Sequence, residues 1–374
     1  DPDMASMIHN EMRKHGIKLV LGYTVEGFKE KDNGVEVLLK DNPSLQADMV
    51  VLAIGVTPDT VLAKEAGLEL GIKESIVVND RMETSVPDIY AAGDAVQVKH
   101  YVTGNDALIS LAGPANKHGR IIADNICGGD SRYLGSQGSS VIKVFDMTAA
   151  TTGINETNAK KSGLEVDTVI LSPMSHAGYY PGGKVMTMKV VFEKETYRLL
   201  GAQIIGYEGV DKRIDVLATV IHAGLKATQL KDLDLAYAPP YSSAKDPVNM
   251  AGFMIDNIAK GTLKQWHLED MDKISRDKSV VLLDVRTVGE FNRGHMDGFK
   301  NIPVDELRER INEIEKGKPV YLICQSGLRS YIASRILEGN GYETYNFSGG
   351  FRFYDAVVND RALIEKAYAC GMDY

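Results

Sequence analysis

Near the C-terminal end of the sequence, an apolar strand stops at a cysteine and a helix begins shortly after it. The strand is predicted over Val320–Cys324, the turn over Gln325–Arg329 and the helix over about Ser330–Asn340. A second strand, Val280–Val285, and a helix over Val304–Glu315 come before them. Because strands that alternate with helices form parallel sheets, these elements predict a small α/β domain.

The cysteine between strand and helix is the strongest candidate for chemistry. A tight turn wraps backbone N–H groups around the sulfur of Cys324, and the helix N-terminus adds positive potential, so the thiolate is favoured over the thiol. Arg329 adds a fixed cation with several donors. The loop therefore suits an anion such as a terminal persulfide. The alternative is a small apolar core residue, which we prefer for Cys127 and Cys370.

Cys324, Arg329 and the motifs around them resemble the active site of rhodanese-type sulfurtransferases. Four residues separate Cys324 from Arg329, one fewer than in the Cys-x5-Arg loop of cysteine phosphatases. The resemblance covers roughly the last 105 residues, one whole domain. It includes the motifs Leu283–Arg286, Glu290-Phe291, Gly294-His295, Gly298, Asn301–Pro303 and Gly349–Phe351. It implies that Cys324 and Arg329 are catalytic. For Asp284 and His295 we favour a role as buried hydrogen-bonding partners that hold the loops.

Length and composition restrict the remaining possibilities. A chain of 374 residues suits two or three domains, and 44% hydrophobic with 25% charged residues is typical of a globular protein. The net charge of -9, without a basic cluster, argues against nucleic acid and acidic membranes as partners. No apolar run reaches the ~20 residues of a membrane span. Three widely spaced cysteines favour a reducing compartment, and hence the cytoplasm.

The first residues read as the middle of a domain. A helix is predicted over Ala5–His15 and a strand over Ile17–Gly22, and such a pair normally has partners upstream. Further strands are expected over Gly34–Leu39 and Met49–Ile54, the second buried and closed by Gly55. We therefore expect the chain to be a fragment of a longer protein.

The segments Thr84–Asp94 and Leu111–Lys117 resemble the C-terminal half of the FAD domain in the pyridine nucleotide-disulfide oxidoreductases. In that family the carboxylate matching Asp94 accepts a hydrogen bond from the flavin's ribityl hydroxyl. The helix that starts near Pro114 directs its N-terminus at the flavin ring. The implied FAD site comprises Gly93, Asp94, Leu111, Ala112, Pro114 and, from a later motif, Tyr237. An Asp after a strand is otherwise as often a helix cap.

Between residues 138 and 260 the pattern predicts paired strands followed by two helices. The strands are Val185–Phe192 and Leu199–Ile205, and the helices are Val210–Ala223, capped by Gly224, and Val248–Ala259. Short strands are also expected earlier, around residues 76–78 and 89–92.

Three motifs in this region resemble the dimerisation domain of coenzyme A-disulfide reductases. Their resemblance is stronger to one branch of that family, the NADH-dependent persulfide and polysulfide reductases, which carry a fused rhodanese domain. The motifs are His176–Gly182, Gly209–Asp215 and Tyr237–Asp246. The resemblance implies a homodimer that binds small sulfur-containing substrates.

The same resemblance assigns individual side chains. Tyr179 and Tyr237 approach the redox centre of the partner subunit, where a phenol can hydrogen-bond or protonate a thiolate. Lys245 matches a substrate contact suited to coenzyme A phosphates. Asn116 falls where some members place a histidine that contacts substrate. The alternatives are an interface aromatic pair for Tyr179 and Tyr180, and a solvated loop residue for Lys245.

Two features of this family do not occur in the sequence. There is no Gly-x-Gly-x-x-Gly loop for the pyrophosphate of FAD or NADH, and no cysteine lies in the context of the reductase cysteine. The predicted fold class is α/β, with remnants of two Rossmann-like domains and two further domains. The domains are the end of an NAD-binding domain (1–65), the C-terminal half of an FAD-binding domain (66–135), an α+β dimerisation domain (138–260) and a rhodanese-like α/β domain with a parallel sheet (266–374).

Three functions follow from these patterns. The first is an FAD- and NADH-dependent reductase of coenzyme A disulfide, coenzyme A persulfide or polysulfide, in which Cys324 carries sulfane sulfur. The second is chiefly a rhodanese sulfurtransferase on a flavoprotein-derived dimer scaffold. The third is a non-enzymatic sulfur-binding or redox-sensing module. Flavin absorbance would favour the first, and thiosulfate:cyanide transfer without flavin the second.

Overall fold

The computed structural model describes residues 1–370, with side chains for residues 1–365. Its contacts divide the chain into two compact units. The first joins Asp1–Leu19 to Ser140–Leu363, and the second holds Val20–Ser139 with the residues from Ile364. The N-terminal helix therefore belongs to the same unit as residues 140–363.

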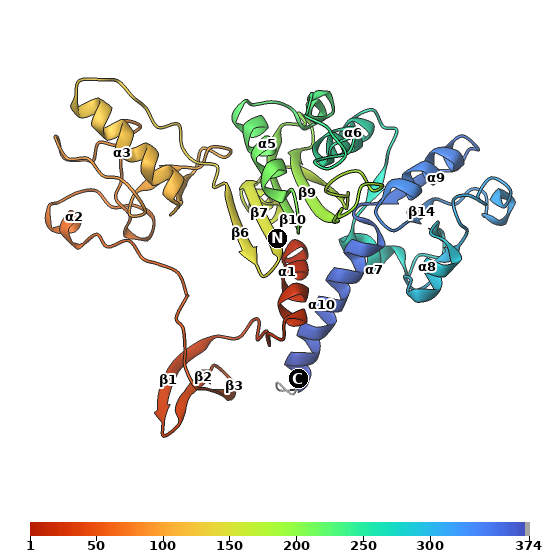
Figure 1. The fold of residues 1–374 in the computed structure, drawn as a ribbon, viewed down its shortest axis with the longest axis horizontal. Helices are drawn as coiled ribbons and strands as arrows, with labels where there is room; N and C mark the ends of the chain where they lie inside the picture. Colours follow the sequence, from red (N-terminus) through yellow and green to blue (C-terminus); the bar gives the residue numbers. More distant parts are fainter. Residues whose placement is uncertain (371–374) are drawn as a thin grey trace. The chain divides into compact units, whose positions relative to one another are not determined.

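An antiparallel sheet of five strands forms one half of the first unit (Figure 1). Its order is β6-β7-β10-β9-β8, with the bounds Ser140–Val144, Met147–Gly153, Leu199–Gly206, Met186–Glu193 and Val166–Leu171. Strands β9 and β10 are the predicted pair. The short helices α4 and η2 span Glu156–Lys161 and Ala227–Asp232.

The two predicted helices of this half are present. Helix α5 (Val210–His222) packs on β7 and β10, and Gly224 follows it with a left-handed φ of 68°. Helix α6 (Pro247–Ala259) begins at Asp246, whose carboxylate accepts the Val248 N–H. Both helices thus begin and end close to the predicted positions.

A parallel sheet of five strands forms the other half of the first unit, as the sequence predicted. Its order is β11-β15-β14-β12-β13, with the bounds Gln265–Trp266, Thr344–Phe347, Val320–Ile323, Val281–Asp284 and Lys300–Asn301. The α-helices of this half are α7 (Met271–Ile274), α8 (Val288–Arg293), α9 (Leu328–Glu338) and α10 (Gly350–Cys370).

The helix predicted over Val304–Glu315 is wrong. The segment turns through successive bonds between residues three apart, such as Leu307 N–H to the Val304 carbonyl, and only Ile311–Glu313 forms a 3₁₀ turn. Leu307 and Ile314 are nevertheless buried. The spacing of apolar residues correctly indicated which side chains are buried. It could not distinguish a helix from tight turns that bury the same side chains.

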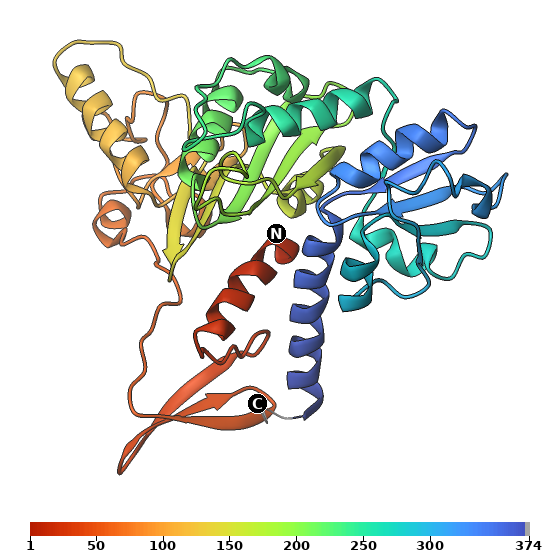
Figure 2. The ribbon, with the colours of Figure 1, turned by 45° about the vertical axis from the view of Figure 1, so that its right-hand side comes forward.

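Helix α1 (Pro2–Lys14) ties the two halves of the first unit together and lies beside α10 in both Figure 1 and Figure 2. Its His9 Nδ1 lies 2.9 Å from the buried carboxylate of Asp360 on α10. At its start, Asp3 accepts a 2.7 Å bond from Nζ of Lys189, a buried lysine of β9. A buried ion pair fixes one geometry, so α1 is held at both ends.

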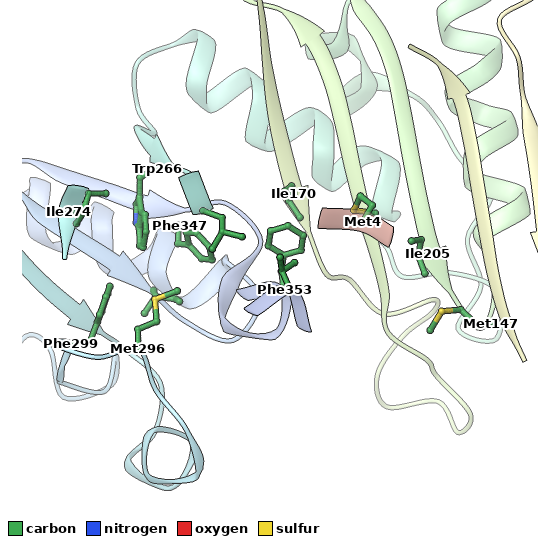
Figure 3. Packing of buried hydrophobic residues seen from close by; sticks show 13 residues of the cluster. Met4, Met147, Ile170, Ile205, Trp266, Ile274, Met296, Phe299, Phe347 and Phe353 are labelled. Atoms are coloured by element: carbon green, nitrogen blue, oxygen red, sulfur yellow. The ribbon is translucent and has the colours of Figure 1, made fainter. Parts of the chain in front are cut away.

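One apolar cluster crosses from one sheet to the other. It includes Met4 of α1, Ile170 and Ile205 of the antiparallel sheet, and Trp266 and Phe353 of the other half. Figure 3 shows the cluster continuing without a break between the two sheets. The two halves of the first unit therefore share a core.

The second unit is built from short elements. A meander of β1, β2 and β3 spans Val25–Lys31, Gly34–Leu39 and Asn42–Ala47, and a small hairpin of β4 and β5 spans Gln97–Lys99 and Asp106–Leu108. Helix α3 runs over Ala112–Ile126, where the sequence predicted a helix, and α2 and the 3₁₀ turn η1 span Val61–Glu65 and Ile72–Glu74.

Several predicted strands of the second unit are absent. The segment 49–54 pairs with none of the described strands, and its Val51 and Ile54 side chains are 77% and 92% exposed. A strand needs neighbours for its hydrogen bonds, and this apolar segment has none here. Residues 17–22 form no strand, and the segments near 76 and 90 form only isolated bridges.

Candidate active site

The sulfur of Cys324 lies at the junction of β14 and α9. Gly327 holds a φ of 99°, which an L-residue adopts only with strain, and this turn points its N–H at Sγ over 3.2 Å. The hydroxyl of Ser330, in the first turn of α9, also lies 3.2 Å from Sγ. Cys324 is only 1% exposed. Two donors and the N-terminus of α9 thus meet at one buried sulfur.

Arg329 contacts a carboxylate and not the sulfur. Its Nη1 and Nη2 each lie 2.7 Å from an oxygen of Glu290 on α8. The hydrogen bonds from Arg329 hold the pKa of Glu290 at about 2, against some burial, with further help from Thr287. The donors that reach Sγ are Gly327 and Ser330. Arg329 is therefore one member of an ion pair beside the loop, and its catalytic role stays a prediction.

The loop is supported from both sides. Asp284 is fully buried and binds Arg286, with 2.7 Å between Oδ2 and Nη2, as the sequence predicted for this aspartate. On the other side, the N–H of Phe351 at the start of α10 donates to the Cys324 carbonyl over 2.8 Å. His295 is exposed and not buried as predicted, but it keeps a hydrogen-bonding role, with Nδ1 lying 3.1 Å from the Phe291 carbonyl oxygen.

A cavity of about 720 Å³ lies beside this loop. Gln325, the residue after the cysteine, lines it together with the two arginines Arg293 and Arg352, which are exposed. The acidic residues on its wall are Glu290, which is bound to Arg329, and Asp355. The surplus of cations suits an anionic molecule approaching the loop.

The two predicted tyrosines meet in the other half of the first unit. The phenol oxygens of Tyr179 and Tyr237 lie 3.0 Å apart, and the side chains are 77% and 46% exposed. The hydrogen bond from Tyr179, with slight burial, raises the pKa of Tyr237. Tyr237 also lines a cavity of about 580 Å³ with His176 and Lys212. The pair therefore presents a proton-bearing group at an open surface.

A buried ion pair holds the loop that carries Tyr237. Arg213 of α5 donates from Nη2 to Asp246 over 2.9 Å and to the Ser175 carbonyl over 2.9 Å. Burial opposes ionisation of Asp246, but bonds from Ser242, the Val248 N–H and Arg213 outweigh it and lower its pKa. The exposed Lys245, next to Asp246, lies 5.9 Å above the Phe253 ring. No described contact links Lys245 to the tyrosines.

Five of the six residues predicted to hold FAD gather at the start of α3, whereas Tyr237 belongs to the first unit. The Gly93 N–H donates to Nδ1 of His118 over 3.2 Å, and the Asp94 carbonyl accepts the Ser110 hydroxyl over 3.4 Å. Leu111 is the N-cap of α3, which begins at Ala112. These contacts bring the glycine-aspartate turn to the helix N-terminus, as the motif implied.

The other predicted members of this site lie on the first turns of α3. Pro114 is half-buried, and the exposed Asn116 donates from Nδ2 to the Ala112 carbonyl. His118, which sequence reasoning missed, is buried, and desolvation lowers its pKa. The carboxylate of Asp94 is exposed beside this helix start.

The remaining cysteines differ from expectation or lie beyond description. Cys127 is exposed at the end of α3, so its prediction as a core residue is wrong. It follows the amphipathic helix rather than lying on its apolar face. Cys370 lies where side chains are not described. Among the described residues, no cluster of His, Cys, Asp and Glu could hold a metal, and no helix combines the length and hydropathy of a membrane span.

Two contributors to the sulfur site were missed by sequence reasoning. Ser330 directly follows Arg329, and its place in the first turn of the helix was the available signal. Glu290 was noted as a motif residue only. Its pairing with Arg329 joins positions far apart in sequence, which no local pattern specifies.

Family comparisons cover most of the chain. Residues 1–119 match the family described as pyridine nucleotide-disulphide oxidoreductase, and residues 139–247 match its dimerisation domain. Residues 267–356 match the rhodanese-like domain. These matches agree with the predicted fold class.

Curated relatives match about two thirds of the chain. An NAD(P)H sulfur oxidoreductase (CoA-dependent) of Pyrococcus abyssi is 36% identical over 248 residues, covering 66% of this chain and 55% of that protein. A coenzyme A disulfide reductase of Staphylococcus aureus is 33% identical over 254 residues, covering 68% and 57%. The chain thus spans a little more than half the length of these relatives.

Two solved structures resemble nearly the whole chain. The reduced Bacillus anthracis CoADR-RHD is 45% identical with a TM-score of 0.93, over 96% of this chain and 64% of that one. The NAD-dependent persulfide reductase from A. fulgidus is 39% identical with a TM-score of 0.87, over 95% and 65%. The likeness extends across both halves of the first unit.

Proposed function

Because this chain belongs to the pyridine nucleotide-disulphide oxidoreductases and carries a rhodanese-like domain, we propose that the whole protein is an FAD- and NADH-dependent reductase of sulfur substrates. Its substrates are disulfides or persulfides of coenzyme A, or polysulfide, and Cys324 carries the sulfane sulfur. The names of similar proteins support this assignment, because they describe a coenzyme A disulfide reductase, a persulfide reductase and a CoA-dependent sulfur oxidoreductase.

The geometry around one sulfur carries the proposal. Sγ of Cys324 receives the Gly327 N–H and faces the Ser330 hydroxyl at the N-terminus of α9, with both contacts at 3.2 Å. The nucleophile in sulfur exchange is a thiolate, and these donors point at the sulfur that would attack. The thiolate attacks the outer sulfur of a donor, a new S–S bond forms, and the donor's own S–S bond breaks with its electron pair on the leaving group.

Mass spectrometry tests this function directly. After incubation with thiosulfate or polysulfide, the intact protein should gain about one sulfur, ~32 Da. Cys324→Ser should abolish the gain, whereas Cys127→Ser, which removes an exposed thiol, should keep it. A gain that persists in Cys324→Ser would move the site to another cysteine and defeat the rhodanese assignment.

The other half of the proposed reaction involves the flavoprotein residues. When bound, the flavin supplies hydride transfer between NADH and the sulfur centre. Asp94 would accept a hydrogen bond from the ribityl chain, and the start of α3 at Leu111, Ala112 and Pro114 would face the ring. Asn116 lies one turn further along and would contact substrate.

The tyrosines and Lys245 would act on the sulfur substrate. The phenol of Tyr237, joined to Tyr179 over 3.0 Å, would hold or donate a proton at a thiolate, and Tyr237 would also contact the flavin. Lys245 would bind phosphate groups of coenzyme A. Substituting Lys245 by Gln in the full-length protein should raise KM for coenzyme A persulfide more than for polysulfide.

We further propose a homodimer that uses the dimerisation domain at residues 138–260. The exposed aromatic side chains Tyr179, Tyr241 and Phe253 of this domain suit such an interface. Light scattering on the sized protein should give the mass of a dimer, and a monodisperse folded monomer would contradict the proposal. The boundaries 1–65, 66–135 and 266–374 remain part of the same proposal, as does a cytoplasmic location.

A rhodanese on a flavoprotein-derived scaffold is the second candidate, and the match of residues 267–356 to the rhodanese-like domain supports it. One preparation assayed for both NADH oxidation with a persulfide and thiosulfate:cyanide transfer separates the two functions.

A further inference from the structure

The hydroxyl of Ser330 lies between two acceptors. Its Oγ is 3.2 Å from Sγ of Cys324 and 3.1 Å from the carbonyl oxygen of Gly327. The side chain is completely buried, so water offers it no third partner. Because a hydroxyl carries one hydrogen, Ser330 can donate to the sulfur or to the carbonyl, but not fully to both.

The carbonyl keeps a second donor when the hydroxyl turns away. Nδ2 of Asn346, on β15, lies 3.3 Å from the Gly327 oxygen, and this side chain is 2% exposed. A buried carbonyl left without any partner would oppose the rotation. The Tyr331 N–H also donates to this oxygen, over 3.1 Å, so the Gly327 carbonyl stays hydrogen-bonded in either orientation of the hydroxyl.

The charge on the sulfur then decides between them. A thiolate is a much stronger acceptor than a thiol or a disulfide-type sulfur, because hydrogen bonds to ions are stronger than those between neutral groups. We propose that Ser330 is a catalytic residue of sulfur transfer, whose hydroxyl donates to Sγ while that sulfur is an anion and returns to the Gly327 carbonyl once the charge has moved. This inference rests on the proposed function of Cys324.

The charge moves in the transfer step itself. With thiosulfate, the thiolate lone pair of Cys324 forms a bond to the outer sulfur, and the S–S bond of thiosulfate breaks with its electrons on sulfite. The product is Cys–S–S⁻ with its charge on the terminal sulfur, and no proton is taken up or released. Sγ has become a neutral bridging sulfur, so Ser330 stabilises the nucleophile and not the persulfide.

A matched pair of serines on one helix tests the inference. Ser334 lies one turn further along α9, is 1% exposed, and donates to the Tyr331 carbonyl three residues back, over 2.7 Å. Ser330→Ala and Ser334→Ala therefore each remove a buried hydroxyl from α9, but only the first touches the sulfur. Iodoacetamide alkylation of the Cys324 peptide is followed by mass spectrometry across pH.

In Ser330→Ala, the midpoint of the alkylation profile should move up by about one pH unit, since a hydrogen bond to a charged group contributes at least that much. Alkylation and thiosulfate uptake at neutral pH should slow about tenfold. Ser334→Ala should follow the parent protein. If Ser330→Ala destabilises the fold, Ser330→Thr and Ser330→Val form a near-isosteric pair that differs in the hydroxyl, and only the valine variant should show the shift.

The two hypotheses fail in different ways. If the parent protein accepts no sulfur, the proposed function is wrong. The role of Ser330 would still be tested by comparing the alkylation profiles of the parent protein and Ser330→Ala. If Ser330→Ala or the valine variant keeps the parent's profile, the hydroxyl serves only to cap the turn and the inference is overturned.

Discussion

Glu290 binds both terminal nitrogens of Arg329, with 2.7 Å at each contact, so the arginine of the cysteine loop brings its own counter-ion. The side chains are 21% and 31% exposed, which places the pair at the mouth of the site and not in the core. The loop therefore gains less positive charge than its sequence suggests. The effect of this ion pair on sulfur uptake can be measured by replacing Arg329, Glu290 or both.

Arg329→Met should slow sulfur uptake about tenfold, because it leaves the Glu290 carboxylate uncompensated beside an anionic nucleophile. The double variant Glu290→Gln with Arg329→Met removes both charges and should recover most of that loss. Rates of thiosulfate uptake in a double-mutant cycle give the coupling. Additive losses would show that the carboxylate does not act on the sulfur site.

The same pair predicts a pH-dependent contribution to stability. The pKa of Glu290 falls from its ordinary 4.5 to about 2 on folding, so the folded state favours the ionised form. Its contribution is complete above pH 4.5 and disappears as the pH falls towards 2. Parent protein should exceed Glu290→Gln by about 1 kcal/mol in unfolding free energy at neutral pH, the upper range for partly exposed pairs.

Chemical denaturation of both proteins between pH 7 and pH 3 checks this expectation. The difference in unfolding free energy should shrink steadily on the acid side. A constant difference across that range would mean that the Glu290 carboxylate is not preferentially ionised by folding.

Gly350→Ala should displace the loop that follows Cys324, because the new methyl group would press on its backbone. Gly350 has a φ of 71°, and a Cβ there would lie 2.6 Å from the Ser326 nitrogen and 2.7 Å from the Gln325 carbonyl. Left-handed strain and overpacking together should cost about 2–5 kcal/mol. Gly341→Ala is the control, since its φ is 82° but nothing lies within 4 Å. It should lose about 1–2 kcal/mol and keep sulfur uptake.

Thermal unfolding and thiosulfate uptake on both glycine variants separate strain from displacement of the loop. Equal uptake by the two variants would show that the contact between Gly350 and the loop is unimportant for transfer.

Tyr179→Phe should lower the pKa of Tyr237 towards its ordinary value, because the hydrogen bond that raises it is lost. Alkaline titration of tyrosinate absorbance should therefore show one phenol ionising at lower pH than in the parent protein. Tyr241→Phe, on the same loop as Tyr237, is the control and should leave that step in place. An unchanged titration in Tyr179→Phe would mean that the two phenols do not interact in solution.

The 374-residue chain should bind FAD weakly. It offers Asp94 and the start of α3 but no glycine loop for the diphosphate, and each missing charge-assisted hydrogen bond contributes roughly 1.5–3 kcal/mol. Three such bonds correspond to more than a thousandfold in affinity at about 1.4 kcal/mol per tenfold. Flavin fluorescence titration measures this, and tight binding would show that the flavin site lies elsewhere.

Local patterns predicted much of the first unit. The strand before Cys324 and the pair β9 and β10 are visible in the sequence as apolar runs, and these strands are buried almost throughout. The segment 49–54 has the composition of a buried strand, but composition cannot supply the neighbouring strands that it needs. Its 92% exposed Ile54 shows that burial is decided by tertiary contacts.

The site was predictable where its residues are close in sequence. Cys324, Gly327 and Ser330 lie within seven consecutive residues, at the end of a strand, in a turn and at the start of a helix. This strand–turn–helix pattern places them together. The ion pair of Arg329 with Glu290 depends on how α8 meets α9, and the exposure of His295 depends on the same packing. No rule of spacing gives these contacts.

The apolar cluster shared by the two sheets restricts how sulfur can travel. Met4 and Ile170 belong to the same buried set as Phe353, and α1 is bonded to Lys189 at one end and Asp360 at the other. A cysteine mounted on such a body cannot swing out like the lipoyl or biotinyl arms of carrier domains, because detaching it would expose the shared core to water. Under the proposed function, a sulfur acceptor would therefore have to reach the Cys324 loop, which is held on the shared core.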